Sequence, residues 1–249
     1  MLALFANAGL IVGIFVVLAC PALLRRASHG WLLLAVLVVL ADFLVTAGGG
    51  SLQRYVPGLA HTHWNWFGKI LSLAVVSLIA AALAASGKFR LREMGLSFLQ
   101  SPGTLRAILF VAVPAVALQA VLSATMFGDT TAPTHETVWF QATMPGLSEE
   151  LAFRGVILAL LDRVFVGRFP LGGAKLGYGA IAITLFFGLV HGIMIGDDLQ
   201  LHTSLLSGVY ATLVGFLLVW LRLRTGSIVV PVFAHNALNV VSNVVLKLV

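Results

Sequence analysis

The stretch Pro145-Gly-Leu-Ser-Glu-Glu-Leu-Ala-Phe-Arg-Gly155 places three ionisable side chains, Glu149, Glu150 and Arg154, inside an apolar segment. The composition of the chain indicates what surrounds these side chains. Of the 249 residues 60% are hydrophobic and only 10% are charged, and the mean hydropathy is +1.04. This composition is typical of polytopic membrane proteins and excludes an ordinary soluble domain. An ionisable group at the centre of a membrane span costs roughly 2.5 to 3.5 kcal/mol. The three charges therefore indicate a functional site.

Eight apolar segments follow one another along the chain, each close to the ~20 residues that a membrane-spanning helix needs. They cover residues 2–24, 31–47, 67–86, 104–126, 138–162, 177–195, 203–221 and 228–248. The longest connections, 48–66 and 127–137, are too short to hold a second domain. The sequence therefore predicts an all-α bundle of about eight transmembrane helices, formed by a single integral membrane domain over residues 1–249.

Basic residues gather in every second connection and form no continuous stripe that would bind nucleic acid. They are Arg25, Arg26, Lys88, Arg90, Arg92, Arg106, Arg163, Arg168, Lys175, Arg222 and Arg224. The other connections hold Arg54 and Lys69 and are otherwise acidic or polar. The net charge of +6 then reflects positive-inside sorting. This pattern places both termini on the non-cytoplasmic side and favours a multi-pass protein of a bacterial inner membrane.

The two glutamates of the opening stretch differ in their helical neighbours. Glu150 and Arg154 are one turn apart on one face of an α-helix, so they can neutralise each other as an ion pair. Glu149 lies about 100° away around the helix axis, with no counter-charge nearby in sequence, and is the better candidate for a general base. The alternative is a structural network in which all three charges hold the helix in place.

Two further segments each carry a pair of residues one turn apart: Phe187 with His191, and His235 with Asn239. Peptide hydrolysis needs a base for water, donors for the oxyanion and an acid for the leaving amine. Glu149 and His191 could activate water, while His235 and Asn239 could donate to the oxyanion. Alternatively, Glu149, His191 and His235 could ligate a divalent metal such as zinc. Cysteine takes no part in a metal cluster, because the chain has only one.

These motifs, Glu-Glu-x-x-x-Arg from Glu149, Phe-x-x-x-His from Phe187 and His-x-x-x-Asn from His235, resemble those of the CAAX-protease and bacteriocin-processing family, also called the ABI family. That family includes the type II CAAX prenyl endopeptidase, the Ras-converting enzyme. The resemblance covers residues 138–245, the expected protease core. It implies an intramembrane glutamic-type endopeptidase with a catalytic cavity between the motif helices, and it leaves a metal requirement open.

The resemblance also implies a role for each motif residue. Glu149 and His191 would activate the water, and His235 and Asn239 would form the oxyanion hole. The supporting residues would be Glu150, Arg154 and Phe187. The expected partners are the lipid bilayer and a membrane-anchored peptide or protein substrate, with no nucleic acid.

Two other functions stay open at this level. Bacterial members of the family are linked to bacteriocin self-protection, so a non-catalytic immunity or membrane binding protein of the same fold is one alternative. A proton-coupled transporter is the other, because intramembrane Glu and His also build proton relays. No inverted repeat is evident in the sequence, and this argues against a transporter.

The two histidines are expected at different depths. By the segment boundaries above, His191 lies about 14 residues from the inner end of its helix and His235 about seven, an offset of roughly 10 Å. Backbone that is not helical is tolerated at membrane depth only where it is buried in protein or faces water. We therefore predict irregular, cavity-lining backbone before Pro231.

Overall fold

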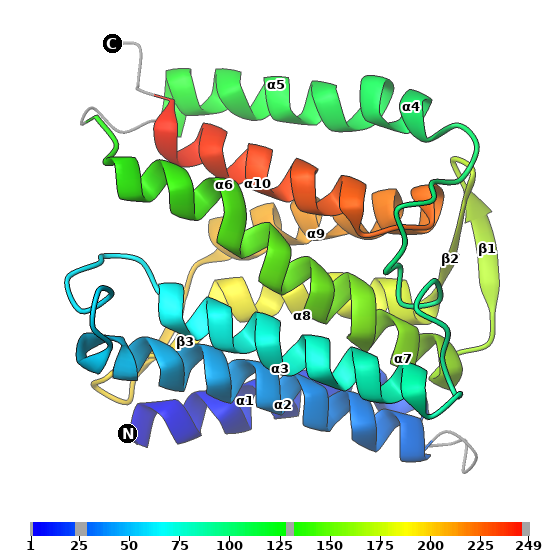
Figure 1. The fold of residues 1–249 in the computed structure, drawn as a ribbon, viewed down its shortest axis with the longest axis horizontal. Helices are drawn as coiled ribbons and strands as arrows, with labels where there is room; N and C mark the ends of the chain where they lie inside the picture. The colour runs from blue at the N-terminus through cyan, green and yellow to red at the C-terminus, as the bar shows by residue number, and fades with distance from the viewer. Residues whose placement is uncertain (1, 23–28, 128–131, 246–249) are drawn as a thin grey trace.

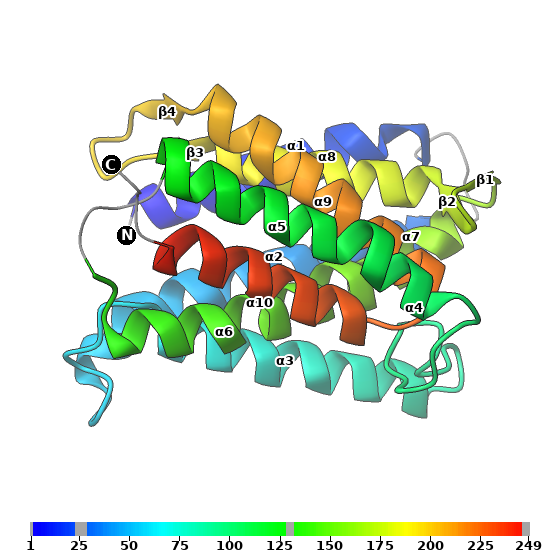
Figure 2. The ribbon, with the colours of Figure 1, turned by 90° about the horizontal axis from the view of Figure 1, so that it is seen from above.

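A computed structural model describes residues 2–22, 29–127 and 132–245. Within these residues the chain forms eight helical rods that run roughly side by side (Figures 1 and 2). The rods are α1 (Leu2–Ala19), α2 (His29–Leu52), α3 (Trp66–Ala85), the run α4 (Thr104–Ala107), η4 (Ile108–Ala112), α5 (Val113–Leu122) and η5 (Ser123–Phe127), the run α6 (His135–Glu149), η6 (Glu150–Ile157) and α7 (Leu158–Val164), α8 (Tyr178–Gly192), α9 (Leu205–Thr225) and α10 (Val229–Val244). The predicted all-α membrane bundle is confirmed.

Five of the rods are long and apolar enough to cross a membrane: α1, α2 with its extension η3 (Gln53–Tyr55), the run from α4 to η5, α3 and α9. Two more, α8 and α10, are apolar but shorter. The remaining rod, α6 to α7, carries the charged motif. The rods that hold the motifs are therefore those least like simple lipid-facing spans, as expected of helices that line a polar site.

Short non-helical elements close the two ends of the bundle. At one end β1 (Arg168–Leu171) and β2 (Ala174–Gly177) form an antiparallel hairpin before α8. At the other end β3 (Ile193–Ile195) pairs with β4 (Leu201–Thr203) between α8 and α9. A 3-10 turn, η1 (Cys20–Ala22), follows α1.

The two ends of the bundle differ in charge. The first and last described helices begin and end on the side of β3, whereas β1, β2 and the connections that carry Lys88, Arg163 and Arg168 lie at the opposite side (Figure 1). The expected alternation of basic connections is therefore present. Arg25 and Arg26, which belong to the same pattern, lie outside the described residues.

The predicted end of the second segment at residue 47 is wrong, because α2 continues to Leu52. Gly48, Gly49 and Gly50 fall in the predicted connection 48–66, whereas the structure places them in the helix. A Cβ on Gly49 would lie 2.7 Å from the backbone of Gly68 at the start of α3. The close contact with α3 thus requires glycine here, and tertiary packing overrides the low helix propensity of the residue.

The irregular backbone before Pro231 is short and covers residues 226–228. Helix α9 ends at Thr225, Gly226 takes a left-handed conformation with φ 76°, and α10 already begins at Val229. The buried Ser227 hydroxyl donates to the Ser97 carbonyl at 2.6 Å. Ser227 is thus buried within this short connection, whereas Gly226 and Ile228 are partly exposed.

The main apolar core lies among α1, α2, α7 and α8 and holds Phe15, Ala35, Val38, Leu158 and Phe186. Phe15 and Phe186 meet edge to face with ring centroids 5.2 Å apart. This core holds α8 against the N-terminal helices. The charged segment at the junction of α6 and η6 borders it and faces α3 and α10.

Candidate active site

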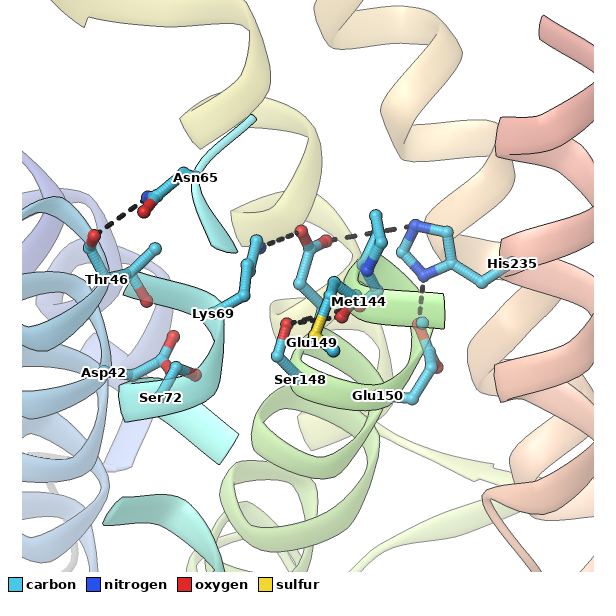
Figure 3. Close-up of polar contacts among 12 residues, drawn as sticks. Asp42, Thr46, Asn65, Lys69, Ser72, Met144, Ser148, Glu149, Glu150 and His235 are labelled. Atoms are coloured by element: carbon cyan, nitrogen blue, oxygen red, sulfur yellow. Dashed lines mark hydrogen bonds and ion pairs between the residues drawn. The ribbon is translucent and has the colours of Figure 1, made fainter. Parts of the chain in front are cut away.

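Glu149 is the last residue of α6, and its two carboxylate oxygens have different surroundings (Figure 3). Oε1 accepts a hydrogen bond from the Lys69 ammonium at 2.6 Å. Oε2 lies 3.9 Å from Nε2 of His235, is buried and has no hydrogen-bond partner among the described residues. Such an oxygen in a folded protein calls for a functional explanation.

The expectation that Glu149 lacks a counter-charge is wrong. Lys69 supplies one from the first turn of α3, 80 positions earlier in the chain. The count of charges grouped Lys69 with a connection, although it falls within the predicted segment 67–86; the structure places it in α3 with its side chain pointing at Glu149 (Figure 3). Sequence neighbours could not reveal this pair, because only the packing of α3 against α6 brings the two residues together.

Glu150 and Arg154 form the predicted ion pair, with Oε1 and Nη1 2.9 Å apart and both side chains fully buried. The segment around them differs from the expected α-helix, because residues 150–157 form a π-helix. Arg154 also donates from Nη2 to the carbonyl of Gly215 at 3.3 Å. The pair is thereby joined to α9, and π-helical turns of this kind are frequent at functional sites.

His235, on α10, connects the two glutamates. Its Nδ1 lies 2.8 Å from Oε1 of Glu150, and its Nε2 faces Glu149. The imidazole is buried, with 5% of the residue exposed. An Nδ1–H that donates to Glu150 fixes the ring and directs Nε2 to the side where Glu149 lies.

Phe187 is the common neighbour of the motif side chains. Its ring centroid is 4.3 Å from that of His191 and 6.2 Å from that of His235, and the Arg154 guanidinium carbon lies 4.3 Å from it. The residue beside His235 is thus Phe187, one turn before His191. The Phe187 ring thus lies close to both histidines, and the expected difference in their depth stays a prediction.

His191 lies at the end of α8, where its Nδ1 is 2.7 Å from the carbonyl oxygen of Phe187. A proton on Nδ1 donated to that carbonyl leaves Nε2 as the acceptor of the neutral ring. His191 and Glu149 line the same cavity of about 190 Å³, which also contacts Lys69 and Asp42. The structure therefore brings the two predicted water-activating residues to one cavity.

Asn239 lies one turn after His235 on α10 and is partly buried. Its side-chain amide makes no hydrogen bond within the described part of the chain, so it has free capacity to donate. The predicted set of Glu149, His191, His235 and Asn239 thus comes from three neighbouring rods. Glu149 and His191 share the cavity, while His235 and Asn239 lie on the α10 side of Glu149.

Sequence reasoning missed Asn236, which connects α10 to α6. Its Oδ1 accepts from the Gly146 backbone N–H at 2.7 Å, and its Nδ2 donates to the Thr143 carbonyl at 3.2 Å. Pro145 stands inside α6, and a proline in a helix interior frees backbone polar groups that need other partners. Pro145 was the sequence signal for this contact, because the backbone groups that a proline frees inside a buried helix need a polar side chain such as an amide as their partner.

The metal-binding alternative does not match the arrangement of side chains. No group of three or more His, Cys, Asp or Glu residues is placed to hold a metal ion within the described ranges. Lys69 already binds Glu149 Oε1, and its positive charge repels a cation at that oxygen. The set Glu149, His191 and His235 therefore does not form a cluster of metal ligands within the described ranges.

Comparison with known families supports the resemblance. Residues 131–241 match the family model described as Rce1-like, type II CAAX prenyl endopeptidase Rce1-like. The matched segment contains all three motifs and excludes the first four rods. Comparison with curated proteins and with solved structures gives no match. The match supports a CAAX endopeptidase type of function in an integral membrane protein.

Proposed function

We propose that this chain, whose residues 131–241 match the Rce1-like family model, is a glutamic-type intramembrane endopeptidase. It hydrolyses a peptide bond in a membrane-anchored protein or peptide, and we place it in a bacterial inner membrane. The observation that carries the proposal is the Glu149 carboxylate. Its buried Oε2 has no partner among the described residues and lies 3.9 Å from His235, while Glu149 shares a cavity with His191.

The first chemical step is attack by water. Glu149 takes one proton from the water, His191 orients it through Nε2, and the water oxygen forms a bond to the scissile carbonyl carbon. The electron pair of the carbonyl moves to its oxygen, which becomes an oxyanion. Hydrogen-bond donors that are already in position stabilise this oxyanion, and such stabilisation is usually the largest single contribution to catalysis.

His235 and Asn239 are the proposed donors to the oxyanion. In its doubly protonated form His235 donates from Nδ1 to Glu150 and from Nε2 to the oxyanion. The Asn239 amide, one turn further along α10, supplies a second N–H. Glu150 is held in place by Arg154 at 2.9 Å, so the donor ring is fixed by a buried ion pair.

The second step breaks the C–N bond. The oxyanion collapses, the leaving nitrogen takes the proton that Glu149 received, and the products are a carboxylic acid and an amine; the acid then transfers its proton to the amine, which leaves a carboxylate and an ammonium ion. Glu149 returns to its ionised form. No metal enters this sequence, because each proton and charge is assigned to a side chain of the site.

The substrate is expected to reach the site from the bilayer. The catalytic side chains lie inside a bundle whose rods include five long apolar helices, and such a site is open to substrates that are themselves anchored in the membrane. Prenylated CAAX proteins are the substrates that the family description names. For this chain we propose a broader class of substrate, namely a peptide or protein held at the membrane.

The test compares membrane protein N-termini in cells that carry the wild-type chain and cells that carry Glu149→Gln. Peptide-bond hydrolysis predicts a set of new N-termini that disappears in Glu149→Gln and persists in the matched control Glu93→Gln, whose exposed side chain pairs with Arg163 at the basic end. Identical N-termini in all three strains would overturn the proposal. Protection from a bacteriocin in the Glu149→Gln strain would then favour the non-catalytic immunity function.

A further inference from the structure

Lys69 is the feature of the site that lies outside the matched segment 131–241. It stands in the first turn of α3, and its ammonium contacts Oε1 of Glu149 at 2.6 Å. Both side chains are mostly buried, with 15% and 16% exposed. A lysine and a glutamate held this closely inside an apolar bundle are a specific arrangement, because an unpaired charge there is costly.

The start of α3 is fixed tightly enough to hold Lys69 at one position. Asn65 accepts from the Gly68 backbone N–H and donates to the Thr46 carbonyl of α2, each at 2.9 Å. A Cβ on Gly68 would overlap the Thr46 carbonyl oxygen, so α3 approaches α2 closely at this residue. Lys69 follows directly and extends from this contact towards Glu149 (Figure 3).

Lys69 divides the functions of the two Glu149 oxygens. By binding Oε1 it fixes the rotation of the carboxylate, and Oε2 is then directed at Nε2 of His235, 3.9 Å away. A general base must present its accepting oxygen in a defined direction, because a shift of about 1 Å can cost roughly 100-fold in rate. The lysine cation also favours the ionised carboxylate, which is the form that accepts a proton.

Asp42 on α2 completes this group of charges. It is partly buried, lines the same cavity, interacts electrostatically with Lys69 and accepts a hydrogen bond from Ser72 (Figure 3). When Glu149 takes a proton from water it becomes neutral and ceases to balance Lys69. Asp42 then remains as the second carboxyl group that interacts electrostatically with Lys69.

The other charged or titratable groups around Glu149 come from different rods. His191 on α8 and His235 on α10 interact with it electrostatically, while Glu150 and Arg154 neutralise each other. Lys69 is thus the cationic side chain in direct contact with the Glu149 carboxylate within the described residues.

We propose that Lys69, with Asp42 as its second counter-charge, is a positioning residue that orients the Glu149 carboxylate and keeps it ionised for water activation. This inference rests on the proposed endopeptidase function. It assigns a direct part in that reaction to α2 and α3, two rods that carry none of the three motifs.

The first test uses Lys69→Met, Lys69→Arg and the control Lys175→Met, whose lysine lies exposed on the β1–β2 hairpin. In Lys69→Met we expect kcat to fall roughly 100-fold with little change in KM. The acidic limb of the pH profile of kcat should move up by about one pH unit or more. In Lys69→Arg the acidic limb should lie at the same pH as in the wild type, and Lys175→Met should behave as the wild type.

The second test needs no substrate. A hydrophobic carbodiimide reacts with protonated carboxyl groups, and mass spectrometry locates the labelled residue. At neutral pH we expect Glu149 in folded Lys69→Met protein to be labelled about tenfold faster than in the wild type or in Lys69→Arg. The folded state is checked by size-exclusion elution and thermal unfolding in detergent.

The outcomes separate the two proposals. Equal labelling of Glu149 in the wild type and in Lys69→Met would overturn the positioning role, whether or not a substrate is cleaved. Faster labelling in Lys69→Met, combined with a wild-type protein that cleaves nothing, would support the role of Lys69 and contradict the endopeptidase function. Wild-type kcat and an unchanged pH profile in Lys69→Met would overturn the inference while the function stands.

Discussion

The Arg154 guanidinium lies over the face of the Phe187 ring, 4.3 Å from its centroid. Arg154 belongs to the π-helical segment that follows Glu149, and Phe187 belongs to α8. The same ring contacts His191 and His235. The Phe187 ring therefore helps to set the relative positions of three motif helices. Its volume packs against the two imidazoles, and its quadrupole attracts the Arg154 guanidinium.

Replacing this ring by an aliphatic side chain tests its role. Phe187→Leu keeps most of the volume but removes the cation–π contact and the imidazole packing. We expect a loss of about 1 to 3 kcal/mol in the free energy of unfolding and a fall in kcat. Thermal unfolding in detergent and single-turnover cleavage measure the two effects. Phe98→Leu is the control, since Phe98 is 91% exposed; an equal response of both variants would contradict the assignment.

The buried pair of Glu150 and Arg154 predicts strong coupling between the two residues. Glu150→Gln or Arg154→Met leaves one fully buried charge without its partner and should cost about 3 to 5 kcal/mol. The double variant removes both charges and should be more stable than either single one. A double-mutant cycle on unfolding free energies measures this, and additive effects would show that the ion pair is not the source of the loss.

The hydrogen bonds of Asn236 to α6 predict a separate effect. Asn236→Ala leaves the Gly146 N–H and the Thr143 carbonyl without their partner, and we expect about 2 to 3 kcal/mol of destabilisation. Because Glu149 follows three residues after Gly146, kcat should fall as well. Asn243→Ala on the same helix is the matched control, since Asn243 is exposed and bonds only to the Asn239 carbonyl. A loss as large in the control would contradict the role of Asn236.

The parts of the fold that the sequence predicts are those governed by local pattern. Segment hydrophobicity locates the rods to within a few residues in most cases, and one-turn spacing correctly pairs Glu150 with Arg154. The end of α2 was missed because the glycines there pack against α3. That contact joins residues distant in sequence, and no property of residues 48–50 alone reports it.

The site shows the same limit. Motif residues on three segments were predicted to meet, and the structure brings Glu149 and His191 to one cavity. Lys69 was missed because its partner lies on another rod, and the pairing depends on how α3 packs. The π-helix at 150–157 was also missed, since a sequence pattern with a one-turn repeat does not distinguish a π-turn from an α-turn.

A glutamic-type mechanism predicts that activity survives removal of metal ions. After prolonged treatment with chelators, and with metal content measured to be negligible, we expect kcat to stay within about twofold of the untreated protein, because the proposed steps are carried by side chains. Activity that disappears on chelation and returns with zinc would contradict this mechanism. Glu149→Gln sets the background rate in both conditions.

The packing at Gly68 predicts that the reaction depends on the close approach of α3 to α2. In Gly68→Ala the added Cβ overlaps the Thr46 carbonyl oxygen, so α3 must move away and carry Lys69 from Glu149. We expect a fall in kcat of roughly 10- to 100-fold, with faster carbodiimide labelling of Glu149. Gly48→Ala is the matched control, because a Cβ there meets no atom within 4 Å; it should be neutral or slightly stabilising, as alanine favours a helix. Wild-type kinetics and labelling in Gly68→Ala would show that the Lys69–Glu149 contact tolerates a wider helix separation than this packing implies.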